Sequence, residues 1–266
     1  MGRLVFVGAG LNGVRGMTLD ALSEISRADT VFVERYTTYL PDDFEAELLK
    51  RTGKRALPLS RKAVEDGHAV LESSRKGSCV LIAGGDAMTA TTHSSLRIAA
   101  SRNGIDTVIV PGSSILTAAA SYSGLQHYRF GRVVSVPRFT DSFMPDSVLD
   151  NIMFNLENNL HTLLLLDVDQ EKGYYMQPAE CFSQLLHLSS RRNPPPITGD
   201  TFACVVSRAG MEDCATAAGR ISSLAERDFG RHPHSVIIPA RLHFAEAESL
   251  VEFSGAVRDD INSLIM

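Results

Sequence analysis

The order of apolar and polar positions along the chain predicts alternating strands and helices. Short apolar runs in the first half indicate buried strands near residues 3–7, 30–34, 55–59, 79–83 and 107–110. Between them, apolar residues spaced three or four positions apart predict helices near residues 18–28, 42–51, 63–76 and 92–103. The first helix has the clearest pattern, because Leu19, Leu22 and Ile25 form one stripe and Thr18 precedes them as an N-cap.

The second half of the chain begins after Pro111 with small and apolar residues at 114–121. Strands are expected near residues 132–136, 162–168, 201–207, 234–239 and 250–254, and helices near 146–157, 178–188 and 212–227. Such alternation favours a mainly parallel sheet in each half. The predicted fold class is therefore α/β, with an N-terminal α/β domain over residues 1–112 and a C-terminal α/β domain over residues 113–266. Two such domains would flank a cleft, a common place for ligand sites.

Composition and charge narrow the classes of partner. The chain has 266 residues, of which 44% are hydrophobic, and single cores stop growing at about 250 residues, which favours two domains. Its net charge is −5 and its basic residues occur only in short pairs such as Arg191-Arg192, so a nucleic-acid partner is not expected. No apolar stretch approaches the ~20 residues of a membrane span, and the N-terminus does not resemble a signal peptide. A cytoplasmic location is expected.

The cysteines and histidines give little evidence of metal or covalent chemistry. No CxxC pair occurs among Cys79, Cys181, Cys204 and Cys214, and reduced, structural thiols are expected. The His232-Pro233-His234 segment, with His243 nearby, lacks a cysteine or carboxylate cluster, so no metal is predicted. His234 is interpreted as a site residue at the start of a strand, and His243 as a helix-start or substrate-side residue.

Three glycine- or serine-rich loops directly follow predicted strands. The first, Gly8 to Gly13, fits a GxGxxG pattern, and Glu34 lies where a dinucleotide-binding fold has its ribose-binding acid. However, this loop continues through Val14-Arg15-Gly16, and the helical stripe begins only after Thr18. A loop of that length does not aim a helix N-terminus at a pyrophosphate. A dinucleotide site and a purely structural turn remain the alternatives.

The second and third loops strengthen the case for a bound ligand. Residues 83–93 contain Gly84-Gly85-Asp86, which places a carboxylate at the carboxyl end of a strand, where open α/β sheets bind ligands. The alternative is that Asp86 or a threonine only caps the next helix. The third loop, Pro111 to Ile115, is followed by small residues that allow close packing beside a ligand or another backbone.

At these three loops the chain resembles the tetrapyrrole methylase superfamily. Later segments resemble, in the same order, one branch of that superfamily: residues 161–167, Arg208-Ala209-Gly210, Asp228-Phe229-Gly230 with Pro233-His234, and residues 239–248. The resemblance implies two α/β domains with S-adenosylmethionine bound in a cleft between them. The members of this branch methylate the amino group of the 3-amino-3-carboxypropyl-histidine of elongation factor 2 in diphthamide biosynthesis.

The resemblance also implies which residues surround the cofactor. They are Leu11, Asp86, Thr89, Ser114, Ile115, Leu166, Ala209 and His234. Asp86 would either offset a cationic group of S-adenosylmethionine or accept a hydrogen bond from a hydroxyl. The superfamily usually has proline where this chain has Ala87, which is expected to make the second loop more flexible. Paired chains, as a homodimer, are expected from the same resemblance.

The reaction expected from this resemblance needs no nucleophile or base that the sequence can identify. S-adenosylmethionine carries an activated methyl group, and the protein aligns it with the acceptor and excludes water. No Ser–His–Asp or Cys–His arrangement is evident, so no catalytic base is assigned. Two rival functions remain, a carbon methylase acting on a corrinoid or porphyrin, and a non-catalytic nucleotide-binding module with the same fold.

Overall fold

The computed structural model describes residues 2–36, 38–140 and 142–266, and it divides the chain into two compact units. Unit 1 is Met1–Ile115 together with Val168–Tyr174, and unit 2 is Leu116–Asp167 together with Tyr175–Met266. Among the described residues, no helix combines the length and the apolar character that a membrane crossing requires.

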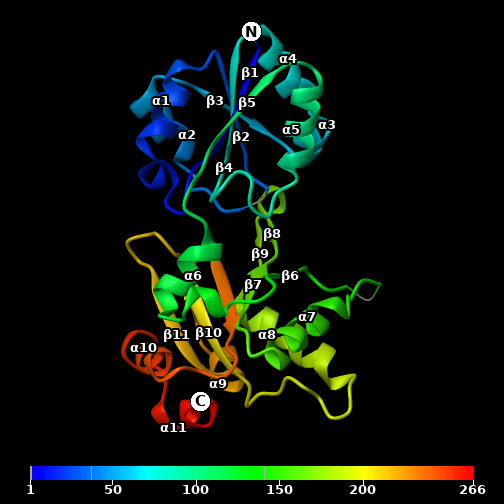
Figure 1. The fold of residues 1–266 in the computed structure, drawn as a ribbon, viewed down its shortest axis with the longest axis vertical. Coiled ribbons are helices and arrows are strands. Elements are labelled where there is room, and N and C mark those ends of the chain that lie inside the picture. Colours follow the sequence, from blue (N-terminus) through cyan, green and yellow to red (C-terminus); the bar gives the residue numbers. More distant parts are fainter. Residues whose placement is uncertain (1, 37, 141) are drawn as a thin grey trace. The chain divides into compact units, whose positions relative to one another are not determined.

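Unit 1 contains a parallel five-stranded sheet with helices on both faces (Figure 1). Its strands are β1 (Arg3–Gly8), β2 (Thr30–Glu34), β3 (Ala56–Leu59), β4 (Ser78–Ala83) and β5 (Asp106–Val110), in the order β3-β2-β4-β1-β5. Its helices are α1 (Leu19–Arg27), α2 (Phe44–Thr52), α3 (Arg61–Asp66), α4 (His68–Lys76) and α5 (His93–Arg102). The expected strands of the first half are therefore confirmed, and all neighbouring strands pair in parallel.

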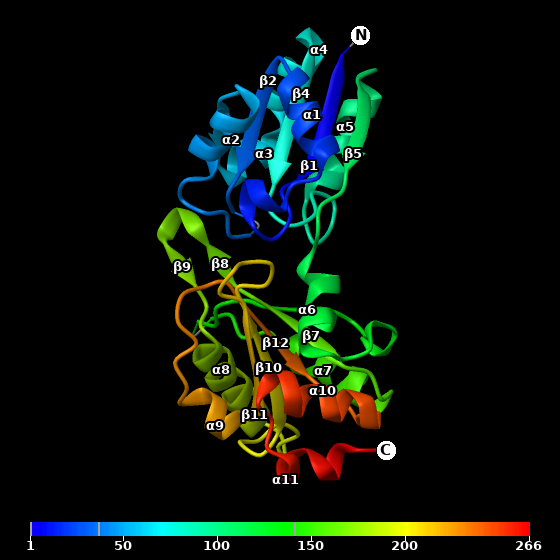
Figure 2. The ribbon, with the colours of Figure 1, turned by 90° about the vertical axis from the view of Figure 1, so that its left-hand side faces the viewer.

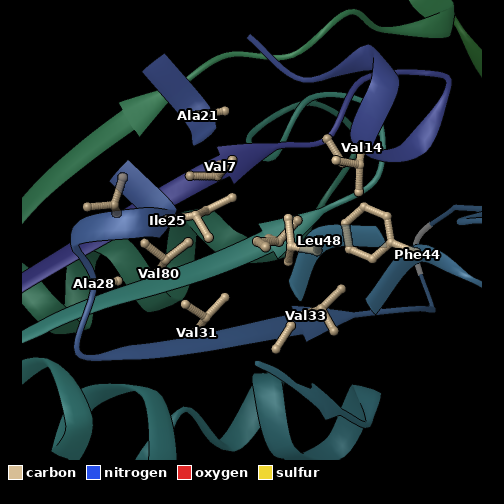
Figure 3. Packing of buried hydrophobic residues seen from close by; sticks show 14 of the residues in the cluster. Val7, Val14, Ala21, Ile25, Ala28, Val31, Val33, Phe44, Leu48 and Val80 are labelled. Atoms are coloured by element: carbon tan, nitrogen blue, oxygen red, sulfur yellow. The ribbon is translucent and has the colours of Figure 1, made fainter. Parts of the chain in front are cut away.

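Both faces of this sheet are buried, which explains why its strands are continuous apolar runs. Alternate strand residues such as Val5 and Val80 pack under α1 and α2, while Leu4 and Leu81 pack under α3, α4 and α5. Figure 3 shows the first cluster, in which Phe44 of α2 lies near Leu48 and Val14. The carboxyl ends of β1, β4 and β5 consequently meet at one edge of a rigid sheet.

Two helix predictions in unit 1 need correction. The helix expected over residues 63–76 is two helices, because Gly67 adopts φ 70° and ends α3 before α4 begins. In α1 the Thr18 hydroxyl accepts from the Ala21 N–H at 3.1 Å, so the predicted N-cap is confirmed. The predicted stripe is wrong at Leu19, which is 85% exposed.

Unit 2 contains a second five-stranded sheet, of mixed pairing. Its strands are β6 (Val134–Val136), β7 (Thr162–Leu166), β10 (Phe202–Ser207), β11 (Ala215–Arg220) and β12 (His234–Ile238), in the order β11-β10-β12-β7-β6. Only β6 and β7 pair in parallel, and the other neighbours are antiparallel. The expectation of a mainly parallel sheet is therefore wrong for this half of the chain.

The helices of unit 2 lie around this sheet, and two expected elements of this half are wrong. The helices are α6 (Ile115–Ser123), α7 (Ser147–Glu157), α8 (Pro178–Ser190), α9 (Ile221–Ala225), α10 (Phe244–Ser254) and α11 (Arg258–Ile261). The strand expected near residues 250–254 lies in α10, where Leu250 is buried while Phe253 is 72% exposed. The range in which a helix was expected, residues 212–227, contains strand β11 followed by the short helix α9.

Residues between β7 and α8 form a small ribbon that the sequence patterns did not predict. Strands β8 (Val168–Asp169) and β9 (Tyr174–Tyr175) pair with each other and lie side by side in Figure 2. The short helical turn η3 (Gln170–Lys172) joins them, with Asp169 accepting from the Lys172 N–H at 3.1 Å.

Candidate functional site

The first glycine loop is anchored to the second by backbone hydrogen bonds. The Gly10 N–H donates to the Gly85 carbonyl at 2.9 Å, and the Gly85 N–H donates to the Gly10 carbonyl at 2.8 Å. The Ala9 N–H donates to the Ala83 carbonyl at 2.8 Å. Gly10 and Gly85 have φ of 69° and 64°, which L-residues with side chains rarely adopt. The two loops are therefore held together by main-chain atoms.

The third loop packs against the first and second loops, because its glycine backbone approaches theirs closely. A Cβ on Gly112 would lie 2.3 Å from the Gly85 carbonyl oxygen, and a Cβ on Gly8 would lie 2.6 Å from the Gly112 nitrogen. Side chains at these positions are incompatible with this packing. The loops after β1, β4 and β5, which are three neighbouring strands, therefore pack directly against one another through their backbones.

Asp86 links the second loop to the third. Its Oδ1 accepts from the Met88 N–H at 3.0 Å and from the Thr89 hydroxyl at 2.9 Å. Its Oδ2 accepts from the Gly112 N–H at 3.2 Å. Asp86 therefore fixes the loop backbone, and it does not cap α5, whose N-cap residue is Thr92.

The remaining predicted residues of unit 1 lie on the first and third loops. The Leu11 N–H donates to the Ser113 hydroxyl at 3.3 Å, which ties the first loop to the third. Ser114 precedes α6, Ile115 is the first residue of that helix, and both are partly exposed. The structure thus brings together the loops that carry Leu11, Asp86, Thr89, Ser114 and Ile115. Gly112 and Ser113, which hold these loops, were not predicted as site residues.

The side chains of His93 and Thr91 bind the backbone of the second loop. His93 is fully buried, its Nδ1 lies 2.6 Å from the Ala87 carbonyl, and its ring stacks on Phe6 with centroids 6.1 Å apart. The Thr91 hydroxyl donates to the same carbonyl at 3.1 Å. The backbone at Ala87, where the superfamily usually has proline, is therefore fixed by two side chains.

The geometry of the first loop disfavours the dinucleotide alternative. Residues Gly13–Gly16 form the short 3-10 helix η1, and α1 begins only at Leu19, so the last glycine of the pattern does not open the helix. Glu34 is 1% exposed, and its Oε2 accepts from the Tyr36 N–H at 3.0 Å. The carboxylate is thus used within the fold, whereas a ribose-binding acid must be accessible.

Three predicted residues lie at one edge of the sheet of unit 2. Leu166 ends β7, Ala209 follows β10, and His234 begins β12 opposite Ser207. These strands are neighbours in the order β10-β12-β7, and all three residues are less than a tenth exposed. His234 therefore starts a strand, as predicted.

His234 is held as a neutral imidazole. Its Nδ1 lies 2.9 Å from the Ser207 hydroxyl, and its ring meets Phe229 edge-on with centroids 6.3 Å apart. Burial, followed by the positive charge of Arg208, lowers the pKa of His234 to about 4. The side chain consequently carries no charge at neutral pH.

Arg208 organises this edge, and the sequence patterns did not identify its role. Its guanidinium donates to the carbonyls of Phe229 and Arg231, both at 2.7 Å, and to that of Asp213 at 3.0 Å. It thereby joins the loop after β10 to the loop before β12. Its backbone has φ 53°, an uncommon conformation for a residue other than glycine.

Two further histidines and two cysteines have structural contacts. His243 caps α10 in a capping box with Glu246, which confirms its expected helix-start position. His232 stacks on Tyr175 with ring centroids 3.5 Å apart. Within the described ranges, no group of three or more histidine, cysteine or acidic side chains is arranged to hold a metal ion. Cys79 and Cys204 lie buried in β4 and β10, and burial raises the pKa of their thiols to about 11 and about 12.

Comparison with known proteins agrees with this arrangement. The family of tetrapyrrole (corrin/porphyrin) methylases matches residues 3–225. The diphthine synthase of Methanothermobacter thermautotrophicus is 36% identical over 263 residues, 99% of this chain and 100% of that protein. The diphthine synthase of Methanospirillum hungatei is 37% identical, over 95% of this chain and 98% of its own length.

Solved structures give the same result. A crystal structure of diphthine synthase superposes with a TM-score of 0.89 at 32% identity, covering 98% of this chain and 99% of that one. The family, its relatives and the fold therefore agree over nearly the whole sequence. The chain belongs to the tetrapyrrole methylase family and, within it, to the group that contains the diphthine synthases.

Proposed function

We propose that the chain methylates the amino group of the 3-amino-3-carboxypropyl-histidine of elongation factor 2, a step of diphthamide biosynthesis. The observation that carries this proposal is the nearly full-length identity to diphthine synthases. The chain is a methyltransferase, and its methyl donor is S-adenosylmethionine, the donor used throughout its family. The interlocked glycine loops support the proposal, because they hold the predicted residues at the carboxyl ends of neighbouring parallel strands, where open α/β sheets bind ligands.

The residues proposed to bind the cofactor form two groups. Leu11, Asp86, Thr89, Ser114 and Ile115 are the group in unit 1, and Leu166, Ala209 and His234 are the group in unit 2. The mixture of apolar side chains with a few polar atoms suits adenine and the thioether-like part of S-adenosylmethionine. His234 contributes a neutral ring, so it adds no positive charge near a sulfonium.

The chain's own residues bind and orient, and the cofactor when bound supplies the activated methyl group. The acceptor must be a neutral amine when its nitrogen lone pair attacks the methyl carbon, so its ammonium form first has to lose a proton. No side chain is assigned to take this proton. Alignment of the two reactants and exclusion of water therefore account for the catalysis that we propose for the protein.

The proposal is tested by methyl transfer from labelled S-adenosylmethionine. Elongation factor 2 that carries the 3-amino-3-carboxypropyl arm is expected to become labelled on its modified histidine. Unmodified factor, free histidine and RNA are expected to stay unlabelled. Equal labelling of the unmodified factor would refute the acceptor, and labelling of a corrinoid or porphyrin alone would favour the tetrapyrrole rival.

We also propose that the enzyme acts in the cytoplasm as a homodimer and without a nucleic-acid partner. The net charge of −5 supports the last point, because phosphate backbones are bound by clustered basic side chains. Sedimentation of the purified chain, with and without added RNA, tests both the pairing and the partner. A monomer, or a complex with RNA, would contradict the corresponding part.

A further inference from the structure

Asp167 lies at the edge of the unit 2 sheet that carries the three residues proposed to bind the cofactor in that unit. It directly follows Leu166, the last residue of β7, and Leu166 pairs with Val136 of β6. Because β12 and β10 are the next strands of the sheet, His234 and Ala209 belong to the same edge. Asp167 is partly exposed. A carboxylate therefore lies beside the proposed cofactor residues and is accessible to a second ligand.

Two main-chain groups fix the position of Asp167. Its Oδ2 accepts from the Arg138 N–H at 2.9 Å, which attaches it to the segment after β6. Its main-chain carbonyl accepts at 3.0 Å from the N–H of Met176, a buried residue that follows β9. The carboxylate is therefore held in place by backbone donors, which leave its negative charge intact.

No neighbouring cation neutralises this charge. Among the described residues, no donor reaches Asp167 Oδ1, and no basic side chain forms an ion pair with the carboxylate. Arg208, which follows β10, pairs instead with Asp213 at 3.0 Å and donates to three carbonyls. His234 of β12 is uncharged at neutral pH. Oδ1 can therefore accept a charge-assisted hydrogen bond from a ligand that carries or develops a positive charge.

The proposed acceptor develops such a charge during the reaction. It attacks as a neutral amine, and its nitrogen lone pair forms the new N–C bond while the C–S bond breaks. The electron pair of the broken bond stays on sulfur, and the positive charge passes from sulfur to nitrogen. The methylated nitrogen afterwards releases one proton to water. A carboxylate fixed beside this nitrogen stabilises the charge that grows there in the transition state.

We propose that Asp167 is a catalytic residue whose Oδ1 accepts a hydrogen bond from the acceptor amine and stabilises the positive charge that forms on its nitrogen. This inference rests on the proposed function, and it adds a contact to the acceptor rather than to the cofactor. An N–H group directed at Oδ1 leaves the nitrogen lone pair available to the methyl carbon. The role is electrostatic, and no proton moves to Asp167 before the attack.

Asp167→Asn removes the charge and keeps the shape, because the amide oxygen can still accept from the Arg138 N–H. Methyl transfer is measured on elongation factor 2 that carries the 3-amino-3-carboxypropyl arm. The variant is expected to lose roughly 10- to 100-fold in kcat/KM, the usual effect of losing a hydrogen bond to a charged group. Calorimetric titration with S-adenosylhomocysteine, the demethylated product, is expected to show unchanged affinity, because Asp167 contacts the acceptor.

The pH dependence of kcat separates this role from a structural one. A carboxylate beside the amine favours its ammonium form, so it raises the pKa of the bound acceptor. The rise of kcat with pH is therefore expected to have its midpoint about 1 pH unit lower in Asp167→Asn than in the wild-type chain. A variant that is merely less stable would keep the wild-type midpoint.

Asp169→Asn is the matched control, because Asp169 lies two residues further along and its carboxylate is already paired with Lys172 at 2.6 Å. This control is expected to keep wild-type kinetics, and thermal unfolding confirms that both variants are folded. Equal losses in the two variants, an unshifted midpoint in Asp167→Asn, or a matching loss of S-adenosylhomocysteine affinity would overturn the inference. Failure of the wild-type chain to methylate the prepared factor would instead contradict the proposed function.

Discussion

The two units hold their predicted site residues by different means. In unit 1, backbone contacts among Gly8, Gly85 and Gly112 lock three loops at the carboxyl ends of parallel strands. In unit 2, one side chain, Arg208, holds two loops through three carbonyl groups. A glycine-rich loop is visible in a sequence, whereas an arginine that binds carbonyls looks like any exposed arginine. The loops of unit 1 can therefore be found from sequence patterns, whereas the individual site residues of both units were assigned from family resemblance.

The cores of the two units also differ, in the polarity of the side chains that they bury. The core of unit 1 consists of two apolar clusters, one on each face of its sheet. Unit 2 buries an ionic cluster in which Glu246 accepts from His161 Nε2 at 3.0 Å and from Arg129, with all three side chains at most a tenth exposed. The Ala240 N–H donates to His161 Nδ1 at 3.0 Å, so the hydrogen lies on Nε2. Unit 2 thus depends on polar groups that must be completely paired.

The largest expected effect is therefore on Glu246. Glu246→Gln leaves the Arg129 guanidinium buried without its counter-charge, and removing one partner of a buried pair costs about 3–5 kcal/mol. Thermal and denaturant unfolding measure the loss. The matched control is Glu248→Gln on the same helix, where an exposed ion pair with Arg258 is lost and no change in midpoint is expected. Equal effects of the two variants would contradict the importance of the buried cluster.

The Glu246 carboxylate is also expected to make the stability of the protein depend on pH. Burial alone raises the pKa of Glu246, but hydrogen bonds from His161 and from the Gln126 and His243 N–H groups outweigh it and lower the pKa to about 2. A lowered pKa adds stability above the unfolded value near 4.5, and this stability is lost as the pH falls toward 2. The stability gap between wild type and Glu246→Gln is expected to narrow over that range.

A smaller effect is expected from ligand binding. S-adenosylmethionine or S-adenosylhomocysteine at a hundred times its dissociation constant is expected to stabilise the chain by about 2.7 kcal/mol. NAD is expected to give no shift in Tm, because α1 begins beyond the GxGxxG loop and Glu34 is buried. Differential scanning calorimetry measures both. A shift with NAD alone would reverse the assignment of the first loop.

The fold of unit 1 could be predicted from its sequence because its strands have a clear apolar pattern, whereas several segments of unit 2 have an ambiguous one. Strands buried on both faces are unbroken apolar runs, such as residues 79–83, and they can be recognised one at a time. Strand β11 is rich in alanine, which favours a helix, and its pairing with β10 makes it a strand. In α10, the run at residues 250–254 resembles a strand although Phe253 is exposed. Tertiary context decides both cases.

Disrupting the packing of the loops in unit 1 is expected to lower both stability and cofactor binding. Gly112→Ala places a Cβ 2.3 Å from the Gly85 carbonyl oxygen, so the loops must separate, at a cost of about 1–3 kcal/mol. S-adenosylhomocysteine binding is expected to fall with stability. Gly199→Ala in unit 2 is the control, because its Cβ would lie 3.4 Å from the nearest atom, an ordinary contact. Normal binding by Gly112→Ala would show that the loop contact is dispensable.

Residues of the candidate site could be predicted where they lie in a glycine-rich loop that the sequence reveals, but the contacts between these loops could not. Asp86 and Thr89 were assigned by resemblance, but the bond between Asp86 and Gly112 depends on how three loops meet. Ser113 was missed although its neighbour Ser114 was assigned, because the bond from the Leu11 N–H joins residues 102 positions apart. Contacts between loops distant in sequence leave no periodic signal in the chain.

The smallest expected effect compares the helix caps of the two units. Thr18 caps α1 with one hydrogen bond to the Ala21 N–H, whereas His243 caps α10 as part of the buried Glu246 cluster. Thr18→Ala is expected to cost about 1 kcal/mol, the usual loss for an N-cap, and Thr18→Ser is expected to restore most of it. Because Thr18 is exposed and α1 packs only through residues such as Ala21 and Ile25, no second interaction adds to the loss. Chemical denaturation with an unchanged m-value measures it. A loss as large as that of Glu246→Gln would mean that α1 depends on its cap as strongly as unit 2 depends on its ionic cluster.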